Sequence, residues 1–358
     1  MAPAARHIST VILSLAALAG AGCGAASGPA TSGSAQAVHG APGAARAGAA
    51  RGQRSTTPAS SAAASTSTTT ASAPTSTATT ASATASVTAA SAAPSPPRVS
   101  APGRLGAGWS TAASVGGDAV AWAAQRGGVT LMRFDQRVLH LVLHAGTAEP
   151  VGVGCPHGCD IAAAERRRVV AGFNGGFKLS LGAGVGFMDG GRVAVPLSSG
   201  LASIVTYRDG ATQIGAWREG VPVRGHGGVS SVLQNLHPLI AGGRRAPTLE
   251  SCAIECWGAT LGGGVVVARS ALGTTGNGQL VWAGGESLSP SAIAGALRGA
   301  GARDAVELDI NPEWVAGYLY ERHPGGLTAA PMVPGQPGIP GQLLSPDSRD
   351  FFTVAAAR

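Results

Sequence analysis

The chain changes character near residue 100, where a stretch without hydrophobic periodicity gives way to regular alternation. From about residue 103 onward, short aliphatic runs are separated by glycine and other turn residues, which is typical of strands. Strands are expected over residues 128–134, 137–144, 169–173, 193–195, 201–207, 212–217, 265–272, 279–282 and 305–310. This pattern predicts an α+β domain over residues 103–358, built on mixed, mainly antiparallel β-sheets flanked by a few α-helices.

Turn residues join several of these strands. Asn277-Gly278 is a favoured two-residue hairpin turn, and Asp209-Gly210 marks a second hairpin. Asp135-Gln136 joins the first two expected strands. The domain is therefore expected to contain many connections between strands that are close in sequence.

Only short helices are expected. Ser289 supplies a capping hydroxyl and Pro290 suits the first helical position, which predicts a helix to about Gly299. Asp160 can cap a second short helix that runs to Arg168.

The segment VELDINPEW, residues 306–314, groups acidic side chains in a domain that has few of them. On a strand, Glu307, Asp309 and Asn311 would share one face, with alternate residues about 6.6 Å apart. That separation resembles the spacing of the two carboxyl groups used in glycoside hydrolysis. The alternative is a structural face on which Glu307 pairs with a nearby arginine.

The N-terminus is typical of an export signal. Arg6 and His7 precede an apolar run over residues 11–21, which is shorter than the about 20 residues that span a bilayer. Small residues lead into Cys23, and this segment resembles the lipobox of bacterial lipoproteins, except that Gly20 occupies a usually aliphatic position. We therefore expect a signal peptide over residues 1–23, with lipidation of Cys23 and a membrane anchor, or else plain cleavage.

Residues 24–102 are expected to form a disordered stalk. The first 100 residues hold no Asp or Glu and are mostly Ala, Ser, Thr, Gly and Pro, a composition that cannot bury a core. They carry five of the chain's 25 basic residues, which leaves 20 basic against 18 acidic residues in the remainder. This balance gives no basic surface for nucleic acid, so no nucleic-acid partner is expected.

Four further cysteines lie in the domain, as CPHGC and CAIEC. An even number of cysteines in an exported domain favours disulfides, and the spacing favours two local loops, Cys155 with Cys159 and Cys252 with Cys256. A four-thiolate zinc site is the alternative.

The sequence does not indicate a dinucleotide site, a serine hydrolase site or a metal site. The glycines at 182, 184 and 186 are not followed by a helical pattern, so a dinucleotide fold is not expected. No serine lies in a Gly-x-Ser-x-Gly elbow, and no cluster of His, Cys, Asp and Glu has convincing metal spacing. No cofactor and no metal are therefore expected.

Five short motifs, in this order along residues 128–320, resemble those of the phosphodiester glycosidase family. They are Phe173-Asn174-Gly175-Gly176-Phe177, Asp189-Gly190, Arg269-Ser270-Ala271-Leu272-Gly273, Gly285-Glu286-Ser287-Leu288 and Ala305-Val306-Glu307-Leu308-Asp309. The resemblance implies an exported hydrolase that acts on a glycosyl phosphodiester or a related glycan of the cell envelope.

Cleavage at a sugar-1-phosphodiester needs a carboxylate at the anomeric centre and cationic or donor groups on the phosphate. Asp309 is the expected nucleophile or general base, Arg269 the expected phosphate ligand, Asn174 a donor and Glu313 a second acid. The remaining substrate contacts are expected from Glu307, Asn311, Trp314, Asp189, Gly175 and Gly176. Ion pairing within a strand and ordinary turn formation are the alternative roles for these residues.

One departure from the family concerns the last motif. The family continues Leu-Asp-Gly-Gly-Gly-Ser, whereas this chain has Leu308-Asp309-Ile310-Asn311-Pro312-Glu313-Trp314. Isoleucine and proline cannot supply the open amides of a glycine loop. A second hypothesis is therefore a module that binds cell-wall glycan without turnover, and a third is a lipid-anchored envelope protein with a purely structural role.

Overall fold

The computed structural model describes residues 8–9, 99–102, 105–181, 184–252, 254–258, 260 and 262–357. Cys23, most of the expected signal peptide and nearly all of the expected stalk lie outside these residues. No helix among the described residues is long and apolar enough to cross a bilayer.

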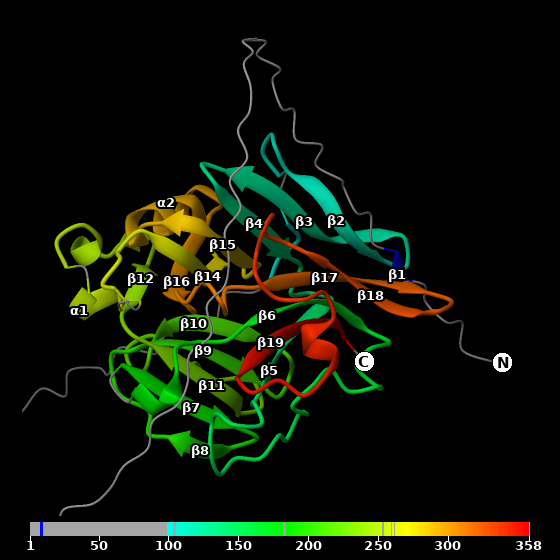
Figure 1. Ribbon diagram of the computed structural model, residues 1–358, viewed down its shortest axis with the longest axis horizontal. Helices are drawn as coiled ribbons and strands as arrows, with labels where there is room; N and C mark the ends of the chain where they lie inside the picture. The colour runs from blue at the N-terminus through cyan, green and yellow to red at the C-terminus, as the bar shows by residue number, and fades with distance from the viewer. Residues whose placement is uncertain are drawn as a thin grey trace, which may run out of the picture. The chain divides into compact units, whose positions relative to one another are not determined.

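In the described part of the chain, the strands form three sheets (Figure 1). The first has nine strands in the order β1-β2-β3-β4-β15-β14-β16-β12-β13, and all neighbours are antiparallel. The bounds are β1 (Ile8–Ser9), β2 (Ser110–Val115), β3 (Asp118–Arg126), β4 (Val129–Phe134), β12 (Pro238–Ala241), β13 (Arg244–Arg245), β14 (Val267–Thr275), β15 (Leu280–Leu288) and β16 (Ala302–Glu307).

The other two sheets have five antiparallel strands each. The order β18-β17-β6-β19-β5 joins β5 (Leu139–His144), β6 (Val169–Asn174), β17 (Gly317–His323), β18 (Gly326–Pro331) and β19 (Phe351–Ala356). The order β10-β9-β11-β7-β8 joins β7 (Val185–Asp189), β8 (Arg192–Val195), β9 (Ala202–Tyr207), β10 (Thr212–Ala216) and β11 (Val229–Asn235).

Helices are few among the described residues. α2 (Pro290–Gly299) is the longer α-helix, and Figure 1 shows it lying against β14, β15 and β16. The others are α1 (Ile254–Trp257) and the 3-10 turns η1 (Leu179–Leu181), η2 (Pro247–Leu249) and η3 (Gln342–Leu344). The fold class is α+β and mainly antiparallel β, as the alternation predicts.

Aromatic packing joins the nine-stranded sheet to the sheet that contains β6 and β19. The Phe173 ring lies 6.5 Å from Phe134, 5.9 Å from Trp282 and 5.8 Å from Phe352, measured between centroids. All four side chains are fully buried. Because Phe173 is followed directly by Asn174, this core fixes the end of β6 beside the first sheet.

Several sequence-based expectations are confirmed. β9 and β10 form one hairpin, and β14 and β15 form another around Asn277-Gly278. α2 begins after Ser289, whose hydroxyl accepts a hydrogen bond from the Ala292 amide at 3.1 Å.

The sequence predicts two joined strands at the start of the domain, and one part of this prediction is correct. Both strands exist, as β4 and β5, but they belong to different sheets. The residue between them explains the separation, because the buried Gln136 amide donates to the Thr212 and Gly278 carbonyls at 3.2 and 2.7 Å. These hydrogen bonds hold the connection in place, and β4 and β5 do not form a hairpin.

Two other expectations need correction. Residues 161–168 contain turns instead of a helix. Nε of Arg166 donates a hydrogen bond to the Ile161 carbonyl at 2.6 Å. The strand expected over residues 305–310 ends at Glu307, so Asp309 lies in the following turn. The strands β2 and β3 were not expected, because their small side chains alternate weakly.

Candidate functional site

Asp309 lies just beyond the end of β16 and is almost completely buried. Its Oδ1 accepts hydrogen bonds from the amides of Ile310 at 2.7 Å and Asn311 at 2.8 Å. Its Oδ2 lies 2.9 Å from Nη2 of Arg349. Burial raises the pKa of the Asp309 carboxyl, while Arg349 and the two amides oppose that rise. The ion pair and the two amides thus stabilise the charged form of this buried carboxyl group against the effect of burial.

Arg349 comes from the segment that leads into β19. Its Nη2 also donates to the Gly176 carbonyl at 2.7 Å, and its guanidinium carbon lies 5.0 Å from the centre of the Trp314 ring. Nε and Nη1 of Arg349 make no hydrogen bond to any described residue. Part of this guanidinium therefore retains donors for a ligand.

Asp350 adds a second buried carboxyl group. Its Oδ2 accepts a hydrogen bond from the Gly176 amide at 2.9 Å, whereas its buried Oδ1 has no partner among the described residues. Burial raises the pKa of Asp350 to about 7; Gly176 and Arg349 oppose the rise, and the charge of Asp309 adds to it. The protonated form of Asp350 therefore persists to higher pH than that of an exposed aspartate.

Asn174 connects the two sheets at this point. Its amide nitrogen donates to the Ser270 hydroxyl at 2.9 Å, and its Oδ1 accepts from the Ala316 amide at 3.2 Å. Ser270 in turn donates its amide to the Asp309 carbonyl at 2.9 Å. The end of β6, the middle of β14 and the turn after β16 are thus joined through Ser270.

A small hollow lies over this cluster. The polar side chains on its wall include Asn174, Asp347, Arg349 and Asp350, and Trp314 provides an aromatic face. Asp309 does not itself line the hollow; it lies behind the Arg349 guanidinium. The hollow has a volume of about 20 Å³, which is room for about one water molecule, so a larger anionic group can meet Arg349 only at its mouth.

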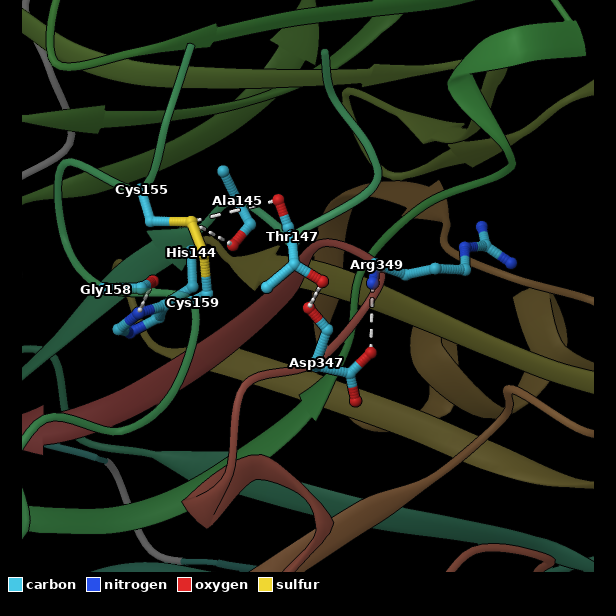
Figure 2. Close-up of a disulfide and its surroundings, with 9 residues drawn as sticks. His144, Ala145, Thr147, Cys155, Gly158, Cys159, Asp347 and Arg349 are labelled. Atoms are coloured by element: carbon cyan, nitrogen blue, oxygen red, sulfur yellow. Dashed lines mark hydrogen bonds between the residues drawn. A yellow bond between two sulfur atoms is a disulfide. The ribbon is translucent and has the colours of Figure 1, made fainter. Parts of the chain in front are cut away.

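The loop closed by Cys155 and Cys159 supports the segment that carries Arg349 (Figure 2). The Asp347 amide donates to the Cys159 carbonyl and the Thr147 amide donates to the Asp347 carbonyl, both at 2.8 Å. The Arg349 amide donates to Asp347 Oδ1 at 3.0 Å. Figure 2 shows the Arg349 side chain extending away from the disulfide, so the loop holds the backbone and leaves the guanidinium free to reach Asp309.

Arg269, the expected phosphate ligand, occupies a different environment. It is fully buried and its Nη1 donates to Glu307 Oε1 at 2.5 Å. Its other hydrogen bonds go to the carbonyls of Leu288 at 2.9 Å, Trp257 at 3.4 Å and Val265 at 2.7 Å. A phosphate contact from Arg269 stays a prediction that this geometry disfavours, because the guanidinium reaches no surface.

Glu307 is likewise fully buried. Burial raises its pKa, and the ion pair with Arg269 opposes the rise. Of the two alternatives for this residue, the structure favours the ion pair with an arginine over a substrate contact.

The remaining predicted residues are dispersed. Glu313 is exposed, and the Asn311 side chain accepts a hydrogen bond from the Glu313 amide at 3.0 Å, which is ordinary turn formation. Asp189 is buried at the end of β7, with Oδ1 2.9 Å from Nδ1 of His157, and does not line the hollow. The structure thus brings together Asn174, Asp309 and Trp314, while Arg269, Glu307, Glu313 and Asp189 lie outside that group.

Both cysteine pairs lie at disulfide distance in the local arrangement that the spacing favours. The Cα atoms of Cys155 and Cys159 are 5.2 Å apart, and those of Cys252 and Cys256 are 5.6 Å apart. The zinc alternative loses its ligands, because all four thiols are bonded.

Arg349 and Asp350 were missed by the sequence reasoning. A weak signal existed, since the charged run Asp347 to Asp350 directly precedes an apolar strand near the C-terminus. Its significance depends on β19 lying between β5 and β6, a long-range pairing that no local pattern indicates.

Gly175 is required because Asp350 approaches its backbone. A Cβ at Gly175 would lie 1.8 Å from Asp350 Oδ2, whereas one at Gly176 would meet only the flexible Leu233 side chain at 3.2 Å. We expect Gly175→Ala to lower the free energy of unfolding by about 2 kcal/mol or more, and Gly176→Ala to lower it by clearly less. Urea unfolding of the two variants makes the comparison, and equal losses would contradict the close approach of Asp350.

Breaking the buried ion pair between Arg269 and Glu307 should lower the free energy of unfolding. Glu307→Gln leaves the Arg269 charge without its counter-ion, so we expect a loss of about 3 kcal/mol in the free energy of unfolding. Glu313→Gln, the exposed control, should change it by less than about 0.5 kcal/mol. If thermal and urea unfolding show Glu307→Gln to be as stable as the control, Arg269 does not depend on this pair.

Comparisons with known proteins leave the family unassigned. No family model and no curated protein matches the sequence. The catalytic domain of zebrafish N-acetylglucosamine-1-phosphodiester alpha-N-acetylglucosaminidase, auto-inhibited by its pro-peptide, is similar over 66% of this chain and 78% of that chain, with 15% identity and a TM-score of 0.40. A hypothetical protein from Synechocystis (68% and 65% covered, 14% identity, TM-score 0.33) and a putative exported protein from Burkholderia pseudomallei (68% and 76%, 10%, 0.27) are also similar.

Proposed function

We propose that the protein is an exported hydrolase that cleaves a glycosyl phosphodiester or a related glycan of the cell envelope. The proposal is carried by the hollow that Asn174, Trp314, Arg349 and Asp350 line, with the Asp309 carboxylate paired to Arg349 behind its wall. The motif order in the sequence supports the same reaction class independently.

The phosphate contact is assigned to Arg349. A guanidinium binds two phosphate oxygens with a planar fork and stays charged at all relevant pH values. Arg349 has unused donors at the hollow, whereas every nitrogen of Arg269 already donates to Glu307 or to a backbone carbonyl. Arg269 then acts as a positioning residue, because its hydrogen bonds fix β14. The next residue of that strand, Ser270, connects Asn174 to Asp309.

The backbone amides of the turn after β16 do not face a ligand as the amides of a glycine loop can. The amides of Ile310 and Asn311 point at the Asp309 carboxylate of their own chain. They are therefore unavailable to a ligand. Both protons of the Asn174 amide already go to the Gly175 carbonyl and the Ser270 hydroxyl, so the donors to the phosphate are assigned to the Arg349 side chain.

Asp309 is the proposed nucleophile or general base. A phosphate monoester leaves well without full protonation, so the main requirement is a carboxylate that stabilises the oxocarbenium-like centre or activates water. When the anionic group of a substrate binds Arg349, that group competes for the same guanidinium and frees Asp309 Oδ2. Asp350, with a pKa near neutrality, is the proposed proton donor.

Two local disulfides support export, since such bonds persist in oxidising compartments. Attachment of the chain to a membrane through Cys23 remains part of the proposal.

A non-catalytic glycan-binding module is the second candidate. The Trp314 ring beside polar side chains suits sugar binding, and the Arg349 pair keeps Asp309 out of the wall of the hollow. In this alternative, ligand binds without release of sugar.

Turnover separates the two candidates. The full chain is incubated with sugar-1-phosphodiesters such as nucleotide sugars, and free sugar is measured. We expect Asp309→Asn to lower the rate at least about 100-fold, a range typical of lost acid/base groups. Asp118→Asn, an exposed carboxylate on β3, should leave the rate unchanged. Saturable binding without sugar release by the parent protein would support the module and contradict the enzyme.

The pH dependence tests the role of Asp350. If its protonated form donates the proton, kcat/KM falls as pH rises through about 7, because burial raises the pKa of Asp350 to about 7. Protonation of Asp309 gives a separate fall in kcat/KM toward low pH. In Asp350→Asn the rate should be lower and the descending limb at high pH should disappear. An unchanged profile between pH 5 and 9 in the variant assigns the limb to another group.

A further inference from the structure

A second concave site lies at the edge of the nine-stranded sheet, away from Asp309. It is a groove of about 390 Å³ formed by β13, η2 and the end of α2. Its charged lining consists of Arg244, Arg245, Arg298 and Glu250, and Leu249 forms part of its floor.

The arginines of this groove differ in what they bind. Arg245 donates to Ser291 Oγ at 3.1 Å and lies 3.6 Å from Glu250. Arg244 and Arg298 are exposed, and their guanidinium groups make no hydrogen bond or ion pair with any described residue. Within the described part of the chain, two guanidinium groups at the groove therefore have no partner, and Glu250, the carboxylate of the described lining, already pairs with Arg245.

Positive charge is concentrated here beyond the average of the domain. Three arginines face one glutamate on the lining. Arg303 and Asp304 lie beside the groove and add one charge of each sign, with Arg303 donating to the Gly242 carbonyl at 3.3 Å and Asp304 accepting from the Gly242 amide at 2.9 Å. Residues 101 to 358 carry only two more basic than acidic residues, 20 against 18, so this local excess is not a general property of the chain. Arg298 also suits the negative end of the α2 dipole, but Arg244 has no such structural role.

We propose that this groove binds the phosphate groups of a linear polyanion. Planar guanidinium groups on several sides of a recess match successive phosphates along a chain. A flat membrane fits less well, because the charged groups surround a recess and the exposed large hydrophobic residues lie elsewhere. Those residues are Val138, Val151, Val193, Ile254, Val266 and Ile339.

The groove is a site separate from the hollow around Asp309. Arg303 lies near the start of β16 and Asp309 follows its end, so six residues of nearly extended chain separate them by about 20 Å. Phosphate binding at the groove does not depend on the proposed hydrolysis and can be measured without turnover.

Binding of long-chain polyphosphate to the full chain tests the proposal by fluorescence anisotropy or calorimetry. Inorganic phosphate and poly-L-glutamate are compared at the same ionic strength. We expect polyphosphate to bind more tightly than either, and Arg244→Ala/Arg298→Ala to weaken its binding at least about tenfold, since charge-assisted hydrogen bonds are lost. The matched control, Arg126→Ala/Arg192→Ala, removes the same charge from exposed positions outside the groove.

Each alternative outcome overturns the proposal. Equal losses in both double variants would mean that only net charge attracts the polymer. Equal binding of poly-L-glutamate would show that the groove does not select phosphate. Unchanged affinity in Arg244→Ala/Arg298→Ala would place the binding elsewhere, and equally tight binding of inorganic phosphate would exclude a polymer as the preferred ligand.

Discussion

The ion pair between Asp309 and Arg349 is the interaction on which the site depends. It ties the turn after β16 to the start of β19, two segments that belong to different sheets. A carboxylate and a guanidinium with so little exposure lose much of their hydration, and their attraction compensates only if further hydrogen bonds satisfy the remaining atoms. Two backbone amides do this for Asp309, and the Gly176 carbonyl does it for Arg349. Asp350 lies beside this pair without a cation of its own, and its carboxyl therefore gains a proton more readily.

Two arginine-carboxylate ion pairs lie at the end of β16 and in the turn that follows it, and they differ in burial. Arg269 and Glu307 lie deeper, where every donor meets the protein and no ligand can enter. Arg349 and Asp309 lie nearer the surface, where some donors stay free. Glu307 and Asp309 are only two residues apart, yet β16 ends between them and they meet different arginines. The inner pair stabilises the strand, and the outer pair is the one that a substrate can disturb.

The sequence predicts the local parts of this structure and fails at its long-range contacts. The capping Ser289, the proline after it and the Asn277-Gly278 turn act over a few residues, so α2 and the β14-β15 hairpin follow from them. Asp309 and Asn174 were predicted from the motif resemblance, and the structure brings them together through Ser270. Sequence alone could not show that Arg269 donates to backbone carbonyls or that β19 inserts beside β6, so it named Arg269 as the phosphate ligand and missed Arg349. Gln136 illustrates the same limit: its hydrogen bonds to distant carbonyls send β4 and β5 into separate sheets.

The turn over Ile310, Asn311 and Pro312 turns its hydrogen-bond donors toward the protein. A glycine loop can offer its amides to a ligand, whereas the amides after Asp309 fold back onto the carboxylate itself. The same turn brings Trp314 under the Arg349 guanidinium, so the aromatic ring restricts the rotation of that side chain. A ligand therefore meets a cation that is already oriented and a carboxylate whose own backbone holds it in place. In the proposed reaction, the substrate must displace part of the Asp309 ion pair, because Arg349 lies between the hollow and that carboxylate.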